Sequence, residues 1–175
     1  MLRITVLGIG NPIMADDGIG LELLGILKAT GPAEGKYDQV ELLYVDGGTS
    51  GMEVLPDVED ADWLIVLDAL AGPGAPGTIH TLIGDQIPRL LQSKLSPHQV
   101  GLLDLLSVAR LGRNEPTRVA VVGIVAETVT LNVGLSATAE SALTSAAETA
   151  RDLVQEWLDE ATTSPASAHD STKAG

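Results

Sequence analysis

Two adjacent acidic residues, Asp16 and Asp17, close a glycine-rich loop between a strand expected at Ile4–Leu7 and a helix expected from about Gly18. Such a loop follows the carboxyl end of a strand, where the ligand crevices of open α/β sheets form. An acidic residue before a helix is also an ordinary N-cap. Capping accounts for only one of the two carboxylates, so the chemistry depends on which other ligands converge on the same edge.

Two more acidic residues end predicted strands. Asp46 follows a strand expected at Val40–Val45, and Asp68 ends a nearly continuous apolar run that starts at Asp62. Together with Asp17, these carboxylates finish three consecutive strands at one edge of the predicted sheet. Negative charges gathered in this way repel one another unless a cation or a shared proton relieves them.

One histidine, His98, has a setting that favours metal or proton chemistry. It belongs to Ser96–Gln99, whose Ser-Pro-His-Gln sequence predicts a capped helix start. The positive end of a helix dipole disfavours an imidazolium, so the neutral ring can coordinate a metal or accept a proton. Two carboxylates and one neutral imidazole suit a transition metal with open positions. His80, on an expected edge strand, and His169, near the C-terminus, are interpreted as ordinary residues without a site role.

The elements that must position these residues alternate between strands and helices. Five strands are expected, at Ile4–Leu7, Val40–Val45, Asp62–Asp68, Thr78–Ile83 and Arg118–Val125. Three helices are expected at about Gly18–Ala29, Gly51–Leu55 and Ser96–Ala109, and a fourth runs from a cap at Ser136 through Trp157. A polar turn is expected at Pro32–Lys36. This order predicts one three-layer α/β domain, with a mostly parallel five-stranded sheet and helices on both faces. The domain covers residues 1–160, and residues 161–175 have no apolar periodicity and are predicted to be a disordered tail.

The composition narrows the class of protein further. The 175 residues are 45% hydrophobic and carry a formal net charge of -14, which argues against nucleic acid and anionic membranes as partners. The absence of cysteine excludes disulfides, thiolate zinc sites and a cysteine nucleophile. No apolar run approaches the roughly 18 residues of a membrane span, and the N-terminus does not match a signal peptide. We therefore expect a cytoplasmic protein without membrane insertion.

Other common catalytic motifs fit the chain less well. It has no His-Glu-x-x-His zinc helix and no Gly-x-Ser-x-Gly nucleophile elbow. The segment from Gly8 to Ile13 partly matches a dinucleotide-binding loop, but Ile13 stands where the third glycine belongs. Pro12 also removes an amide that a phosphate would use. Nucleotide binding stays open as an alternative.

Taken together, these motifs resemble the hydrogenase maturation endopeptidases, which trim the C-terminal extension from the large subunit of nickel–iron hydrogenases. The matching segments occur in the family's order and are Leu7–Pro12, Asp16–Gly18, Asp46–Met52, Leu67–Ala69, Ser96–Asp104 and Gly134–Ser136. Each segment by itself is short and unspecific. Their combination in this order, up to about residue 158, is highly specific.

The resemblance implies a site and an activity. The family's metal-contacting carboxylates fall on Asp17, where relatives often carry Glu, and on Asp68, and its histidine falls on His98. These three residues are expected to bind the metal and act in catalysis, whereas Asp46 matches a further acidic position and Asp16 is expected to turn away as a cap or supporting residue. The family's sheet is twisted and mostly parallel.

The activity implied is that of a hydrolase, an aspartyl-type endopeptidase in hydrogenase maturation. Its partner is a nickel–iron hydrogenase large-subunit precursor that already holds nickel, so the substrate and not the free enzyme supplies the metal. A carboxylate then activates water as a general base. The same three ligands also fit a non-catalytic nickel-binding or nickel-sensing chaperone of hydrogenase assembly, which the motifs do not separate from an enzyme.

Overall fold

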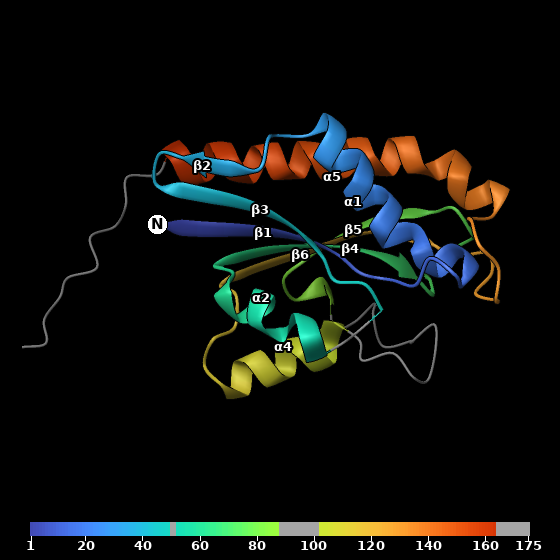
Figure 1. Ribbon diagram of the computed structural model, residues 1–175, viewed down its shortest axis with the longest axis horizontal. Coiled ribbons are helices and arrows are strands. Elements are labelled where there is room, and N and C mark those ends of the chain that lie inside the picture. Colours follow the sequence, from blue (N-terminus) through green and yellow to red (C-terminus); the bar gives the residue numbers. More distant parts are fainter. Residues whose placement is uncertain (50–51, 88–101, 164–175) are drawn as a thin grey trace, which may run out of the picture.

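A twisted β-sheet between two layers of helices organises the molecule (Figure 1). The computed structural model describes residues 1–49, 52–87 and 102–163, and within them the sheet has six strands in the order β2-β3-β1-β4-β6-β5. The strands are β1 (Leu2–Gly8), β2 (Gly35–Tyr37), β3 (Val40–Asp46), β4 (Trp63–Leu70), β5 (Ile79–Ile83) and β6 (Arg118–Val125). The four inner strands are parallel, and β2 and β5 run antiparallel at the two edges.

The central strands are apolar because both of their faces are covered. In β4 the side chains from Leu64 to Leu67 are all fully buried, so inward and outward positions alike are hydrophobic. Nearer the edge, β3 alternates, with Val40, Leu42 and Tyr44 buried and the residues between them partly exposed. These patterns are the ones from which the inner strands were predicted.

Helices cover the two faces of the sheet with separate hydrophobic cores. The short 3-10 turn η1 (Ala15–Gly18) leads into α1 (Ile19–Thr30), which packs with the long C-terminal helix α5 (Ala137–Thr163) on one face. The 3-10 turn η2 (Met52–Val54), α2 (Leu55–Asp60) and α4 (Leu102–Leu111) cover the other face. Figure 1 shows α1 and α5 on one side of the sheet and α2 and α4 on the opposite side.

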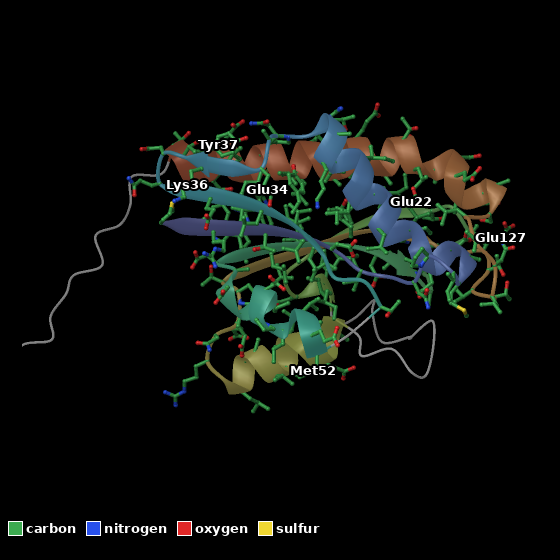
Figure 2. All side chains as sticks on the ribbon, in the orientation of Figure 1. Glu22, Glu34, Lys36, Tyr37, Met52 and Glu127 are labelled. Carbon is green, nitrogen blue, oxygen red and sulfur yellow. The ribbon has the colours of Figure 1, made fainter. Side chains whose placement is uncertain are left out.

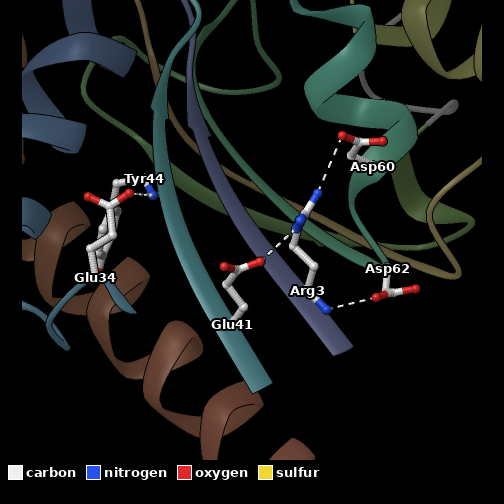
Figure 3. A network of polar contacts seen from close by, with 6 residues as sticks. All are labelled: Arg3, Glu34, Glu41, Tyr44, Asp60 and Asp62. Carbon is white, nitrogen blue, oxygen red and sulfur yellow. Dashed lines mark hydrogen bonds and ion pairs between the residues drawn. The ribbon is translucent and has the colours of Figure 1, made fainter. Parts of the chain in front are cut away.

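The amino ends of the central strands are tied together by charged groups. Arg3 Nε in β1 donates to Glu41 Oε2 of β3 at 3.0 Å, and its guanidinium lies 3.3 Å from Asp60 at the end of α2 (Figure 3). The backbone N–H of Arg3 donates to Asp62 Oδ2 at 2.7 Å. Glu41, Asp60 and Asp62 at this edge are therefore engaged in structural contacts.

The predicted three-layer, mostly parallel α/β fold is confirmed, and all five predicted strands are present. The prediction of five strands was wrong by one, because β2 occupies part of the segment Pro32–Lys36 that was expected to be a polar turn. Its three residues carry no apolar alternation. They form a strand by pairing with β3, where Lys36 faces Glu41 and Tyr37 faces Val40.

Two helix boundaries also differ from the expectations. The segment predicted as a short helix ending at Leu55 continues to Asp60, because Pro56 fits the first turn of a new helix. The last helix runs to Thr163, three residues into the predicted tail, and the remaining tail lies outside the described residues. The predicted cap at Ser96 also lies outside them, and α4 is described from Leu102. No described helix is both long and apolar enough to cross a membrane.

Candidate active site

Three of the predicted acidic residues lie at the carboxyl edge of neighbouring strands. Gly8, the last residue of β1, pairs with Asp46 of β3 on one side and with Leu67 of β4 on the other. Asp46 and Asp68 therefore flank the end of β1, and Asp17 enters the same edge from the loop that follows β1. The structure thus brings together at one edge carboxylates that are up to 51 residues apart in the sequence.

Backbone hydrogen bonds hold the loop after β1 against the ends of the neighbouring strands. Ile9 N–H donates to Leu67 O at 3.1 Å and Gly10 N–H donates to Gly48 O at 2.8 Å. Gly10 has a φ of +146°, and a Cβ there would lie 1.9 Å from Asp17 O. Glycine is required at this position because the backbone that carries Asp17 passes directly over it.

Asp16 is fully buried and points toward the loop that follows β6. Its Oδ2 accepts hydrogen bonds from the backbone N–H of Glu127 at 2.8 Å and of Thr128 at 3.3 Å, and from Ser136 Oγ at 2.8 Å. Its Oδ1 accepts from Ser136 N–H at 2.7 Å. Burial acts to raise the pKa of Asp16, but these hydrogen bonds outweigh it, so that the pKa lies below its usual value. Asp16 is therefore an anion held by the fold.

The expectation that Asp16 turns away as a cap or supporting residue is confirmed in an unexpected form. Its side chain makes no cap hydrogen bond to η1, in which it lies, or to α1, which follows. It binds Ser136 instead, whose Oγ accepts from Ala139 N–H at 3.1 Å at the start of α5. Sequence reasoning identified Ser136 as the cap of the last helix but missed its contact with Asp16, because no local pattern links residues so far apart.

Asp17 and Asp68 lie near enough for the charge of one to affect the other. Asp17 is buried, with 4% of its surface exposed, and Asp68 is partly buried two residues before the end of β4, which runs on to Leu70 past the predicted end at Asp68. Burial, with a further contribution from the negative charge of Asp17, raises the pKa of Asp68 well above its ordinary value, although Asp68 Oδ1 accepts a hydrogen bond from Ala69 N–H at 2.8 Å. A bound cation or a retained proton on Asp68 relieves the repulsion between the two groups.

The other predicted residues have separate positions. Asp46 is exposed on the far side of β1, and its Oδ1 accepts from Gly48 N–H at 2.9 Å in a local turn. His80 lies on the edge strand β5, where its Nε2 is 2.7 Å from Pro73 O, in keeping with its interpretation as an ordinary residue. His98 and His169 lie outside the described residues. Within the described part of the chain, His, Asp and Glu form no group of three that could hold a metal ion.

A family model described as hydrogenase maturation protease matches residues 28–153. The chain belongs to the hydrogenase maturation protease family. The hydrogenase 2 maturation protease of Escherichia coli strain K12 is 39% identical over 151 residues, covering 84% of this chain and 87% of that relative. The resemblance on which the sequence analysis relied is confirmed.

Solved structures of proteins from the family have the same fold as this maturation protease. The hydrogenase maturating endopeptidase HybD from Escherichia coli aligns with a TM-score of 0.75 and 36% identity, covering 89% of this chain and 94% of that one. The [NiFe] hydrogenase maturation protease HybD from Thermococcus kodakarensis aligns with a TM-score of 0.68 and 26% identity, covering 87% and 99%. This maturation protease is accordingly a hydrolase, more specifically an endopeptidase. The two alternative interpretations, a nucleotide-binding module and a non-catalytic chaperone, are no longer supported.

Proposed function

We propose that this protease removes the C-terminal extension of a nickel-loaded large-subunit precursor of a nickel–iron hydrogenase, recognising the nickel through Asp17, Asp68 and His98. The observation that carries the proposal is the placement of Asp17 and Asp68 at the same carboxyl edge of the sheet, where burial raises the pKa of Asp68. The relative from Thermococcus kodakarensis is a [NiFe] hydrogenase maturation protease, which supports nickel as the metal concerned. The proposal keeps the predicted cytoplasmic location.

The pair of carboxylates is suited to a cation that arrives with the substrate. A divalent ion near Asp68 competes with the proton there and offsets the negative charge of Asp17, so the ion stabilises both side chains as carboxylates. His98 would add a neutral nitrogen ligand. A set of two carboxylates and one imidazole without thiolates holds nickel weakly on its own, which favours a metal presented by the precursor.

The same carboxylates supply the hydrolytic chemistry. With the precursor's nickel at the carboxyl edge, the scissile peptide bond lies beside the aspartate pair. One carboxylate accepts a proton from the attacking water while the oxygen adds to the scissile carbonyl. The C–N bond then breaks, leaving a carboxylate on the mature subunit and a protonated amine on the released peptide.

The test compares nickel-loaded and metal-free precursor with an enzyme that has been treated with a chelator and then freed of it. Mass spectrometry of the products is expected to show loss of a C-terminal peptide from the loaded precursor only. Efficient cleavage of metal-free precursor, or activity that returns only when zinc is added to the enzyme, contradicts recognition of substrate nickel.

Matched variants separate the site from general charge effects. Asp17→Asn, Asp68→Asn and His98→Ala are each expected to abolish cleavage of the loaded precursor while the far-ultraviolet circular dichroism stays unchanged. Asp38→Asn is the control, since Asp38 is exposed in the turn between β2 and β3 and its φ of 52° suits asparagine. Equal loss of activity in the control would show that overall negative charge, and not the three residues, determines the reaction.

A further inference from the structure

Three large apolar side chains stand exposed in two loops, one of which leads to Asp17. Ile13 is 50% exposed, Leu131 is 79% exposed and Val133 is 80% exposed. Ile13 belongs to the loop after β1, and the other two belong to the loop between β6 and α5. Apolar side chains that gather at the surface commonly mark a site of protein interaction.

The two loops are joined, so that these side chains form one surface. Met14 and Asn132 make a parallel β-bridge, in which Asn132 N–H donates to Ile13 O at 3.0 Å and Ala15 N–H donates to Asn132 O at 2.8 Å. The parallel register of the bridge places Leu131 beside Ile13. Figure 2 labels Glu127 in the second loop, close to the starts of α1 and α5.

Asp16 fixes this surface in advance of binding. Its carboxylate holds Glu127 and Thr128 before the exposed residues and Ser136 after them. Its backbone N–H also donates to Thr128 O at 3.1 Å. A loop that is already held at both ends loses little conformational freedom when a partner covers it.

We propose that Ile13, Leu131 and Val133 form a docking surface for the folded body of the hydrogenase large-subunit precursor. The inference rests on the proposed function, because Ile13 precedes the site residue Asp17 by four positions and a protein cleaved there must lie against this face. A second copy of the chain fits less well as the occupant. Each copy carries a formal net charge of -14, so two copies repel each other.

The test is steady-state cleavage of nickel-loaded precursor by the triple variant Ile13→Ser, Leu131→Ser, Val133→Ser. Its KM is expected to rise about tenfold or more, since interface anchors typically cost this much when truncated. Its kcat is expected to stay within about twofold, since none of the three side chains acts in the chemistry. Leu111→Ser is the matched control, because Leu111 is 85% exposed at the end of α4.

Two further measurements keep the outcomes separate. A short peptide that spans only the cleavage point lacks the folded body and is expected to give the same, weak KM with the wild-type chain and the triple variant. An unchanged KM for the precursor, or an equal rise in the Leu111→Ser control, overturns the docking surface while cleavage by the wild-type chain still supports the protease function. A wild-type dimer that the triple variant converts to a monomer at unchanged KM also overturns it. If the wild-type chain fails to cleave loaded precursor, the proposed function is wrong. The docking surface is then tested by measuring the affinity of the precursor for the wild-type chain and for the triple variant, and equal affinities overturn it.

Discussion

Asp16 and Ser136 are 120 residues apart in the sequence, and both carboxylate oxygens of Asp16 accept hydrogen bonds from Ser136. The contact joins the turn that carries Asp17 to the first residue before α5. A buried anion with several hydrogen-bond donors is stable in place and costly to alter. The side chain of Asp16 therefore holds together the turn that carries Asp17 and the loop between β6 and α5, which carries part of the proposed docking surface.

Asp16→Asn is expected to lower the free energy of unfolding by about 3 kcal/mol, because the amide NH2 replaces one carboxylate oxygen and faces either the N–H of Ser136 or the N–H groups of Glu127 and Thr128. The pKa of Asp16 is lowered in the folded state, so its contribution is present above pH 3.8 and is lost as the pH falls through the folded pKa. Urea unfolding as a function of pH measures both effects. Asp46→Asn is the control, since Asp46 is exposed and, among the described residues, accepts one hydrogen bond, from Gly48 N–H. Equal stability of the Asp16→Asn variant and the wild type would contradict the role assigned to this residue.

Asp68→Asn is expected to make the protein more stable at pH 8 while it abolishes cleavage. The folded-state pKa of Asp68 lies above the ordinary value of 3.8, so the folded state binds more protons, and wild-type stability falls as the pH rises through this interval. Asparagine keeps an acceptor for Ala69 N–H without the charge. The gain in melting temperature should disappear toward pH 4, and a gain that is independent of pH would show that charge is not its cause.

Two glycines in α1 are expected to respond in opposite ways to alanine. A Cβ at Gly20 would lie 2.2 Å from Ile9 O and 2.3 Å from Leu67 O, which forces the helix away from the strand ends. Gly20→Ala should therefore lose about 1–3 kcal/mol of stability and most of the activity. Gly25→Ala meets nothing within 4 Å and should gain about 0.5–1 kcal/mol from helix propensity. Thermal melts and cleavage assays of both variants measure the contrast, and similar behaviour of the two would contradict the close approach at Gly20.

Arg118 is expected to contribute to the docking of the end of α5. Its guanidinium carbon lies 4.9 Å from the ring centroid of Trp63 and 4.4 Å from that of Trp157, and its Nη1 lies 2.6 Å from Glu160 Oε2. Arg118→Ala should cost about 1–2 kcal/mol and change tryptophan fluorescence, because packing and a cation–π contact are lost together. Arg110→Ala, in an exposed ion pair 3.9 Å long, should have little effect on either measurement. A loss of similar size in both variants would argue against the aromatic contact.

The sequence predicted the inner sheet well because the signal for a buried strand is local. The run from Leu64 to Leu67 is apolar at every position, and a strand covered on both faces needs that pattern. It missed β2 because Gly35–Tyr37 becomes a strand only through its partner β3. The placement of Asp46 and Asp68 at one edge of the sheet followed in the same way, since both come at or near the carboxyl ends of recognisable strands. His98 stays a prediction, because it lies outside the described residues.

By itself the sequence determined the α/β class, the family and the candidate aspartates, because all three depend on short motifs and on apolar periodicity within single elements. Only the tertiary structure decided that Asp16 and Asp17, adjacent in the chain, have different environments. Asp16 lies against the donors of Ser136, whereas Asp17 acts on the charge of Asp68. It also decided that Ile13 meets the loop of Leu131, through the bridge of Met14 with Asn132. Contacts over more than 100 residues depend on how all the layers pack at once, and no local stretch of sequence carries that information.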